Sequence, residues 1–194
     1  MHPFRAFIYQ YNMLSDSEWT EVERKLSRVT YMKGELLLES GKVCKKLYFL
    51  ESGFLRYFTY KEGEDVTKFF TEAPYCFTAQ RSFTGDLPSQ ESIEAVVDSE
   101  VWEMSKTDAF VLLKYLRWSE FIRKLIQEVQ FYTEQILDDV QNNTAEERYI
   151  KMIEQNDPIL VNVPLKDIAS YLGIAPQSLS RIRKKYWDSQ RKLT

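Results

Sequence analysis

The chain carries two kinds of hydrophobic pattern, one after the other. Between positions 31 and 105, short runs of β-branched and aromatic residues alternate with turn glycines, and from position 105 onward the period becomes helical. Short strands separated by turn residues every 8–12 positions or so are typical of an all-β sandwich or barrel. The expected strands are residues 47–50, 54–58, 68–70, 92–97 and 100–104. An earlier segment, residues 14–26, is predicted to be a short amphipathic helix, because Ser15 and Glu18 have the spacing of a capping box.

A long helix without Gly or Pro is predicted over residues 119–141, after a short helix over 105–115. Its apolar residues are spaced 4, 3, 4, 3 and 4 apart, which is the 3.5-residue repeat of a coiled coil. A small barrel offers little surface to a helix of ~33 Å. We therefore favour a seam between two copies of the chain, and packing on its own barrel is the alternative. The predicted seam consists of Trp118, Ile122, Leu125, Val129, Tyr132 and Ile136.

Residues 165–184 fit a helix-turn-helix, preceded by a break at Asn142-Asn143 and a helix over 145–155. In a register that starts at Leu165, the motif needs a small fifth residue, glycine at the ninth, and apolar residues at positions 4, 8, 10, 15 and 18. Pro176 falls in the first turn of the second helix, where its missing N–H costs nothing. All seven positions are satisfied, by Ala169, Gly173, Ile168, Leu172, Ile174, Leu179 and Ile182.

Charge separates this end from the rest of the chain. The net charge is −3, but residues 165–194 hold seven basic and two acidic residues, or +5, which leaves −8 for the other 164 residues. A basic end on an acidic body indicates that only the end meets a polyanion, and we expect that partner to be double-stranded DNA. Gln177 and Arg181 suit base edges, and the other polar side chains suit bases or phosphates. The predicted DNA contacts are Gln177, Ser178, Ser180, Arg181, Arg183, Lys184 and Lys185.

Other classes of function find little support in the sequence. The single histidine, His2, lies next to a terminus that we expect to fray, and no nucleophile or phosphate-loop motif is present, so we expect no enzyme and no catalytic residue. Two cysteines, Cys44 and Cys76, supply neither a disulfide framework nor a four-thiolate metal site, and a reducing cytoplasm is expected. No apolar run approaches the ~20 residues of a membrane span. We expect no metal and no membrane partner.

The order of barrel, long helix and helix-turn-helix resembles the Crp/Fnr family of bacterial transcription regulators over nearly the whole chain. Residues 33–37 and 47–53 are similar to the family's early barrel strands, and residues 168–173 with 178–181 to its DNA-reading element. The resemblance implies an α+β chain with a cyclic-nucleotide-binding-like jelly roll, or double-stranded β-helix. It also implies a homodimer on an inverted-repeat operator, with RNA polymerase as an indirect partner. The implied parts are an effector barrel (1–117), a dimerisation helix (118–141) and a DNA-binding domain (142–194).

The chain departs from the family where cyclic-nucleotide-binding members hold their ligand. Those members carry a Gly-Glu-x-Gly turn whose glutamate holds the ribose, followed about ten residues on by an Arg-Ser whose arginine neutralises the phosphate. The corresponding residues 78–81 and 89–90 lack that carboxylate and that guanidinium, so we expect no cAMP and no cofactor. An unknown effector has as candidate contacts Thr78, Gln80, Arg81, Ser82, Ser89 and Gln90.

A second departure follows the second helix of the motif. Many family members carry a β-hairpin wing there, whereas only residues 186–194 follow here, too short and too charged for two strands. The alternative to a DNA-binding regulator is a ligand-sensing or protein-interaction barrel whose DNA-binding element has lost its function. The intact polar surface over residues 177–185 favours the regulator.

Overall fold

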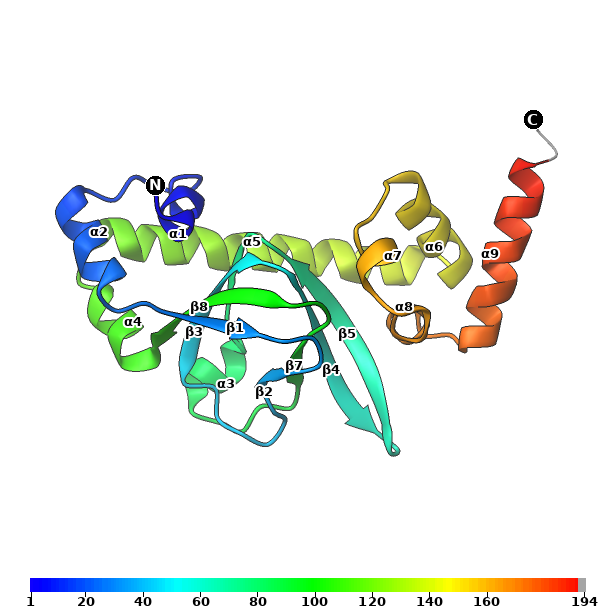
Figure 1. Cartoon of the computed structure of the whole chain (residues 1–194), viewed down its shortest axis with the longest axis horizontal. Helices are drawn as coiled ribbons and strands as arrows, with labels where there is room; N and C mark the ends of the chain where they lie inside the picture. The colour runs from blue at the N-terminus through cyan, green and yellow to red at the C-terminus, as the bar shows by residue number, and fades with distance from the viewer. Residues whose placement is uncertain (192–194) are drawn as a thin grey trace.

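The computed structural model describes residues 1–191 and has the predicted α+β architecture, with a barrel first, a long helix next and a helical domain last (Figure 1). The strands form two antiparallel four-stranded sheets of a jelly-roll type, in the orders β1-β8-β3-β6 and β2-β7-β4-β5. Their bounds are β1 (Ser27–Tyr31), β2 (Leu36–Leu38), β3 (Lys46–Ser52), β4 (Phe54–Lys61), β5 (Glu64–Glu72), β6 (Tyr75–Phe77), β7 (Ser92–Ala95) and β8 (Ser99–Ser105).

The helices precede, interrupt and follow these strands. Capping boxes at Ser15/Glu18 and Thr144/Glu147 open α2 and α6. The predicted long helix begins three residues early, and α1, α3 and α7 were not predicted. Among the described residues no helix is both long and apolar enough to cross a membrane. The bounds are α1 (Pro3–Ile8), α2 (Asp16–Glu23), α3 (Gln80–Gly85), α4 (Lys106–Leu112), α5 (Leu116–Asn142), α6 (Ala145–Glu154), α7 (Ile159–Asn162), α8 (Leu165–Leu172) and α9 (Pro176–Gln190).

The β4–β5 hairpin is the longest in the barrel and projects from it on the side of the helical domain (Figure 1). Its turn residues Glu62 and Gly63 both have positive φ, 54° and 87°, as a two-residue type I′ turn requires. The register shifts by one residue between Tyr57 and Phe58. β5 is the last strand of its sheet, so its outer side is open to the helical domain.

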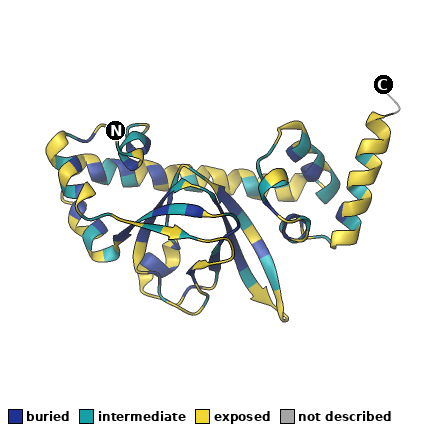
Figure 2. Ribbon diagram, in the orientation of Figure 1, coloured by how far each residue is buried: buried dark blue, intermediate teal, exposed yellow. Residues whose placement is uncertain are grey.

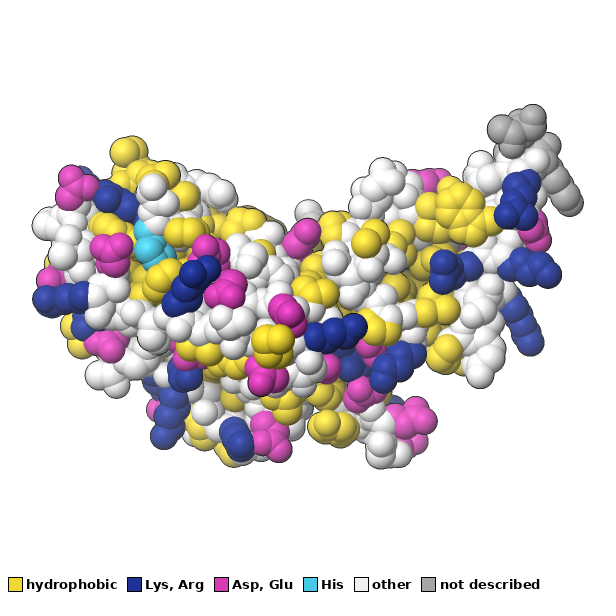
Figure 3. Space-filling model, in the orientation of Figure 1, with side chains coloured by type: hydrophobic (Ala, Val, Ile, Leu, Met, Phe, Trp, Pro, Cys, Tyr) yellow, Lys and Arg dark blue, Asp and Glu magenta, His cyan; other side chains and the backbone are white. Residues whose placement is uncertain are grey.

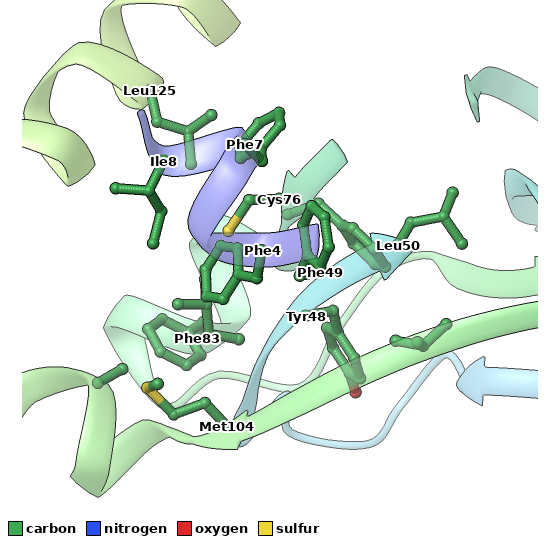
Figure 4. Close-up of a cluster of buried hydrophobic side chains, with 14 of the residues drawn as sticks. Phe4, Phe7, Ile8, Tyr48, Phe49, Leu50, Cys76, Phe83, Met104 and Leu125 are labelled. Carbon is green, nitrogen blue, oxygen red and sulfur yellow. The ribbon is translucent and has the colours of Figure 1, made fainter. Parts of the chain in front are cut away.

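The larger hydrophobic core lies between the barrel, α1 and the first half of α5. Figure 4 shows α1 inserted between α5 and β3, with Phe4, Phe7 and Ile8 pointing into the core near Phe49 and Leu125. The rings of Phe4 and Phe49 stack with centroids 4.7 Å apart. Because each such side chain contributes about 1.5–3 kcal/mol on burial, α1 forms through this packing although it has only six residues.

The first half of the predicted seam belongs to this core, which corrects our prediction. Trp118 and Leu125 are 1% and 6% exposed, and the half-buried Ile122 packs against the same cluster. The alternative of packing on the chain's own barrel therefore holds for these three residues. The 3.5-residue spacing does not reveal whether a helix packs on its own barrel or on a second chain. Here the first half of α5 packs on the barrel.

A second core joins the barrel to the helical domain. It contains Phe54, Phe70 and Val96 from the barrel, together with Tyr149 and Leu172 from α6 and α8. The helical domain is therefore packed against the barrel of its own chain. Beyond this contact, the second half of α5 and most of α9 are exposed (Figure 2).

His2 is half-buried and ordered rather than frayed, contrary to our expectation. Its Nδ1 accepts a hydrogen bond from the Phe4 N–H at 3.1 Å and so caps α1. The imidazole lies 5.0 Å from the ring of Trp19 and 4.4 Å from that of Trp102. Burial is the main reason that the pKa of His2 is lowered from its ordinary value, and the charge of Arg28 acts in the same direction.

The pKa of His2 in the unfolded chain is about 6.5, and its pKa in the folded protein is lower. We predict that the contribution of His2 to the free energy of unfolding is fully present above the unfolded pKa and is lost as the pH falls through the folded pKa. NMR titration of the only imidazole in the chain should give a midpoint below 6.5. His2→Asn, which keeps a capping acceptor, should flatten the decline in stability between pH 7 and pH 5. A midpoint at or above 6.5 would contradict this prediction.

Candidate nucleic-acid interface and effector cleft

The helix-turn-helix has the predicted geometry. Gly173 ends α8 in the left-handed region, with φ 74° and ψ 28°. The N–H of Ile174 donates to the carbonyl of Ala169 at 3.0 Å, which closes the turn. Ala169 and Leu179 are both 0% exposed where α8 and α9 meet. α8 and α9 are thus held together as one rigid unit.

The outer face of α9 presents polar and basic side chains to solvent. Gln177, Arg181 and Lys184 are exposed and lie at i, i+4 and i+7, which places them on one face of the helix. Ser180 is also exposed, but its hydroxyl donates to the carbonyl of Pro176 at 3.0 Å. Figure 3 shows the Lys and Arg side chains along α9 standing out from the helical domain. No strand follows α9 within residues 1–191.

The remaining predicted DNA contacts lie on the flanks of α9. Ser178 is half-buried. Lys185 Nζ pairs with Glu146 Oε1 at 2.7 Å, so part of its charge is neutralised within the chain. Arg183 is exposed and lies on the side of α9 near Tyr149 of α6. Burial raises the pKa of Tyr149, and the positive charge of Arg183 opposes that shift. The face that is free for a partner therefore centres on Gln177, Arg181 and Lys184.

The second half of α5 carries a different apolar surface from the predicted one. Ile126, Leu137 and Val140 are 46%, 55% and 49% exposed, although they are aliphatic. Of the predicted seam, Val129, Tyr132 and Ile136 remain accessible. We define the α5 stripe as the positions spaced 3, 4, 3 and 4 apart along this side: Ile126, Val129, Thr133, Ile136 and Val140. All of them except Val140 also line the cleft between α5 and the barrel.

A cleft of about 910 Å³ lies between the barrel and α5. Its size is that of pockets that hold small molecules. Aromatic rings dominate its barrel side, and those of Tyr57 and Phe69 stack with centroids 4.0 Å apart. Lys68 is the one basic residue in the wall that the described residues form.

The predicted effector residues do not converge on this cleft. Thr78 and Gln80 line it, whereas Arg81 and Gln90 are exposed and outside its wall. Ser82 is buried, and its hydroxyl donates to the Leu87 carbonyl and accepts from the Cys44 N–H.

Ser89 is likewise buried, and its hydroxyl is engaged by the main chain of Glu91. The described lining residues include no guanidinium that could pair with a phosphate. Within residues 1–191, no group of three or more His, Cys, Asp or Glu side chains is placed to hold a metal ion.

Comparison with known proteins agrees with this architecture. Residues 28–115 match the cyclic nucleotide-binding domain family. A Crp/Fnr-family transcriptional regulator from Eubacterium rectale superposes with a TM-score of 0.74 at 15% identity, over 91% of this chain and 85% of that one. FixK2 from Bradyrhizobium japonicum gives 0.72 at 15% identity, over 85% and 86%. The Catabolite Activator Protein of Thermus thermophilus gives 0.54 at 20% identity, over 91% and 85%.

No curated protein sequence matches the chain. The family match covers most of the barrel, and the structural similarity extends through α5 to the helix-turn-helix. Residues 28–115 are therefore similar to the cyclic nucleotide-binding domain family, and the chain as a whole has the fold of the Crp/Fnr transcriptional regulators.

Proposed function

We propose that the chain is a sequence-specific DNA-binding transcriptional regulator that acts in the cytoplasm as a homodimer on an inverted-repeat operator. The observation that carries the proposal is the outer face of α9, where Gln177, Arg181 and Lys184 stand exposed on a helix-turn-helix with a left-handed Gly173. RNA polymerase would be reached indirectly, through the position of the bound dimer.

The chemistry of this face matches the major groove of DNA. An arginine can donate two hydrogen bonds to guanine O6 and N7, and a glutamine can pair with adenine N6 and N7. The excess charge of +5 over residues 165–194 supplies the phosphate attraction that such contacts need. A barrel protein with a non-functional DNA-binding element would have no use for this combination, so we favour the regulator.

The homodimer is proposed from the α5 stripe. A soluble helix normally turns such residues toward a core, and Ile126 and Val140 are 46% and 49% exposed in the single chain. The stripe repeats every 3.5 residues, so a second α5 related by a two-fold axis would bury it as a coiled coil. This arrangement would also place two copies of α9 for two half-sites.

We further propose that cAMP does not control the protein. The cleft between the barrel and α5 is aromatic and has no guanidinium among residues 1–191, and the hydroxyls of Ser82 and Ser89 are already bonded to the main chain. A phosphate placed there would lose water without gaining a charged partner. We propose that an unidentified effector contacts Thr78 and Gln80, which line the cleft.

The first test is selection of a random duplex pool by the purified, ligand-free protein. We expect an enriched inverted repeat with half-sites about one helical turn apart and a steep salt dependence. Arg181→Ala should cost about 1–3 kcal/mol and relax the preference at one base pair of each half-site, whereas Lys184→Ala should weaken all sequences alike.

Arg183→Ala is the matched control, since Arg183 carries the same charge but lies on the flank beside α6. Its effect on affinity should be smaller than that of Lys184→Ala. Sequence-blind binding by the wild-type protein, or an equal loss of discrimination in the Arg181 and Lys184 variants, would contradict the assignment.

Dimerisation is tested by placing carboxylates in the α5 stripe. The double variant Ile126→Glu and Val140→Glu should be monomeric in sedimentation analysis, because the two-fold axis would bury like charges against each other; we expect the dimer dissociation constant to rise more than about 100-fold. Gln127→Glu, on the other side of α5, should stay dimeric. A dimeric double variant would rule out this stripe as the interface.

Binding of cAMP is tested by thermal unfolding and equilibrium dialysis with the full chain. We expect no change in Tm at millimolar cAMP, whereas a ligand present at 100 times its Kd would add about 2.7 kcal/mol. Saturable binding of cAMP that disappears in the Lys68→Ala variant would show that the one basic residue of the wall suffices, and would overturn the expectation.

A further inference from the structure

A buried ionic cluster joins the helix-turn-helix to the barrel. Its centre is Arg56 on β4, whose side chain is only 3% exposed. The guanidinium Nε donates to Thr67 Oγ1 at 2.8 Å, and Nη1 pairs with Asp65 Oδ2 at 2.9 Å and Glu94 Oε2 at 3.5 Å. These three partners all belong to the barrel and engage Nε and Nη1.

The third nitrogen of the guanidinium, Nη2, faces α8. Arg56 Nη2 lies 3.4 Å from Oδ1 of Asp167, whose side chain is 7% exposed. That pair lacks hydrogen-bond geometry, and Nη2 has no hydrogen-bond partner among residues 1–191. Burial raises the pKa of Asp167, and the charge of Arg56 opposes the shift. A buried guanidinium nitrogen needs a counter-charge, and here the helical domain supplies it.

Two further contacts fix α8 on β5. Ser170 Oγ accepts a hydrogen bond from the Thr67 N–H at 2.9 Å and donates to the Asp65 carbonyl at 3.4 Å. The ring of Tyr171 meets that of Phe70 edge-on, with centroids 5.6 Å apart. An ion pair, a main-chain hydrogen bond and a ring contact thus hold three successive parts of the same helix.

The connection through the chain is weaker. Between α5 and α6 only Asn143 and Thr144 are outside helices, and both are extended. Across this joint Asp139 pairs with Arg148 at 3.4 Å and with Lys151 at 3.0 Å. Lys151 is exposed, so its ion pair contributes little to fixing an orientation, whereas Arg148 is buried and its Nη2 also donates to the Tyr171 carbonyl on α8 at 3.5 Å. The orientation of the helix-turn-helix is therefore determined by its contact with β4 and β5 together with this one pair across the joint.

From these contacts we infer that Arg56 and Asp167 are positioning residues for DNA binding: they fix α8 on the barrel and, through the rigid α8–α9 unit, set the direction of α9. The docked arrangement leaves Gln177, Arg181 and Lys184 exposed, so it presents the DNA-binding face and does not cover it. The inference rests on the proposed function, since two copies of α9 must be held at a fixed separation to engage two half-sites together.

The first test compares Asp167→Lys with Glu154→Lys. Each variant adds two positive charges to the helical domain, but Glu154 is exposed and has no ion pair within the described residues. The gain in phosphate attraction is therefore similar in both. We expect Asp167→Lys to bind the selected inverted repeat about tenfold more weakly than Glu154→Lys, with equal affinities for a single half-site. Ser170→Ala, a milder change, should reduce the affinity for the inverted repeat in the same direction.

The outcomes separate the two proposals. Failure of the wild-type protein to select any site would overturn the proposed function and this inference together. Selective wild-type binding that both the Asp167 and the Ser170 variants retain would overturn only the positioning role. Equal losses on the half-site and on the inverted repeat would also overturn it, because they would indicate damage to the helix-turn-helix itself.

A crosslink tests the docked arrangement directly. In the double variant Thr67→Cys and Ser170→Cys, a short reducible bis-maleimide should join the two thiols, since Ser170 Oγ lies 2.9 Å from the Thr67 main-chain nitrogen and the native Cys44 and Cys76 are buried. The crosslinked protein should keep its affinity for the inverted repeat, and reduction should lower it, because the two substitutions remove the hydroxyl contacts of Ser170 and Thr67. Loss of binding on crosslinking that reduction reverses, or failure of the crosslink to form, would overturn the inference.

Discussion

The packing of the first half of α5 on the barrel is the contact on which the rest of the structure depends. Trp118, Phe121 and Leu125 are almost fully buried, and α1 is folded against the same surface. Since α5 has 27 residues, or about 40 Å at 1.5 Å per residue, its second half extends beyond this support. One continuous helix therefore closes the barrel at one end, and carries an unpartnered apolar stripe and the helical domain at the other.

The sequence predicted those parts that local rules determine. A capping box located the start of α2, and the spacing around Gly173 located the helix-turn-helix, because each depends on residues a few positions apart. The face of α5 that meets the barrel depends on tertiary contact. Leu125 and Ile126 look alike in a periodic pattern, yet one is 6% and the other 46% exposed. The short α1 and α3 gave no signal for the same reason.

The candidate sites show the same contrast between local rules and tertiary contacts. The exposed face of α9 follows from helical geometry once the motif is placed. The effector residues follow from family position alone, and in the structure the hydroxyls of Ser82 and Ser89 bond to the main chain instead. Arg56 carries a signal of its own in the sequence, because it is the one charged residue in the apolar run Phe54-Leu55-Arg56-Tyr57-Phe58. A charge in such a run must find partners from elsewhere in the fold, and one of those partners came from α8.

The contact of α8 with β5 also affects the tendency of the protein to aggregate when the helical domain separates from the barrel. An outermost strand offers unpaired main-chain groups to any other strand, which is a common route to aggregation. Here Ser170 occupies the Thr67 N–H and the Asp65 carbonyl, and Phe70 is covered by Tyr171. Any movement that lifts α8 away leaves the Thr67 N–H and the Asp65 carbonyl unpaired and uncovers Phe70 at the side of the barrel. The helical domain thus also shields the edge of β5 from other chains. If the two domains stayed apart for long, this edge would be free to pair with a strand of another molecule.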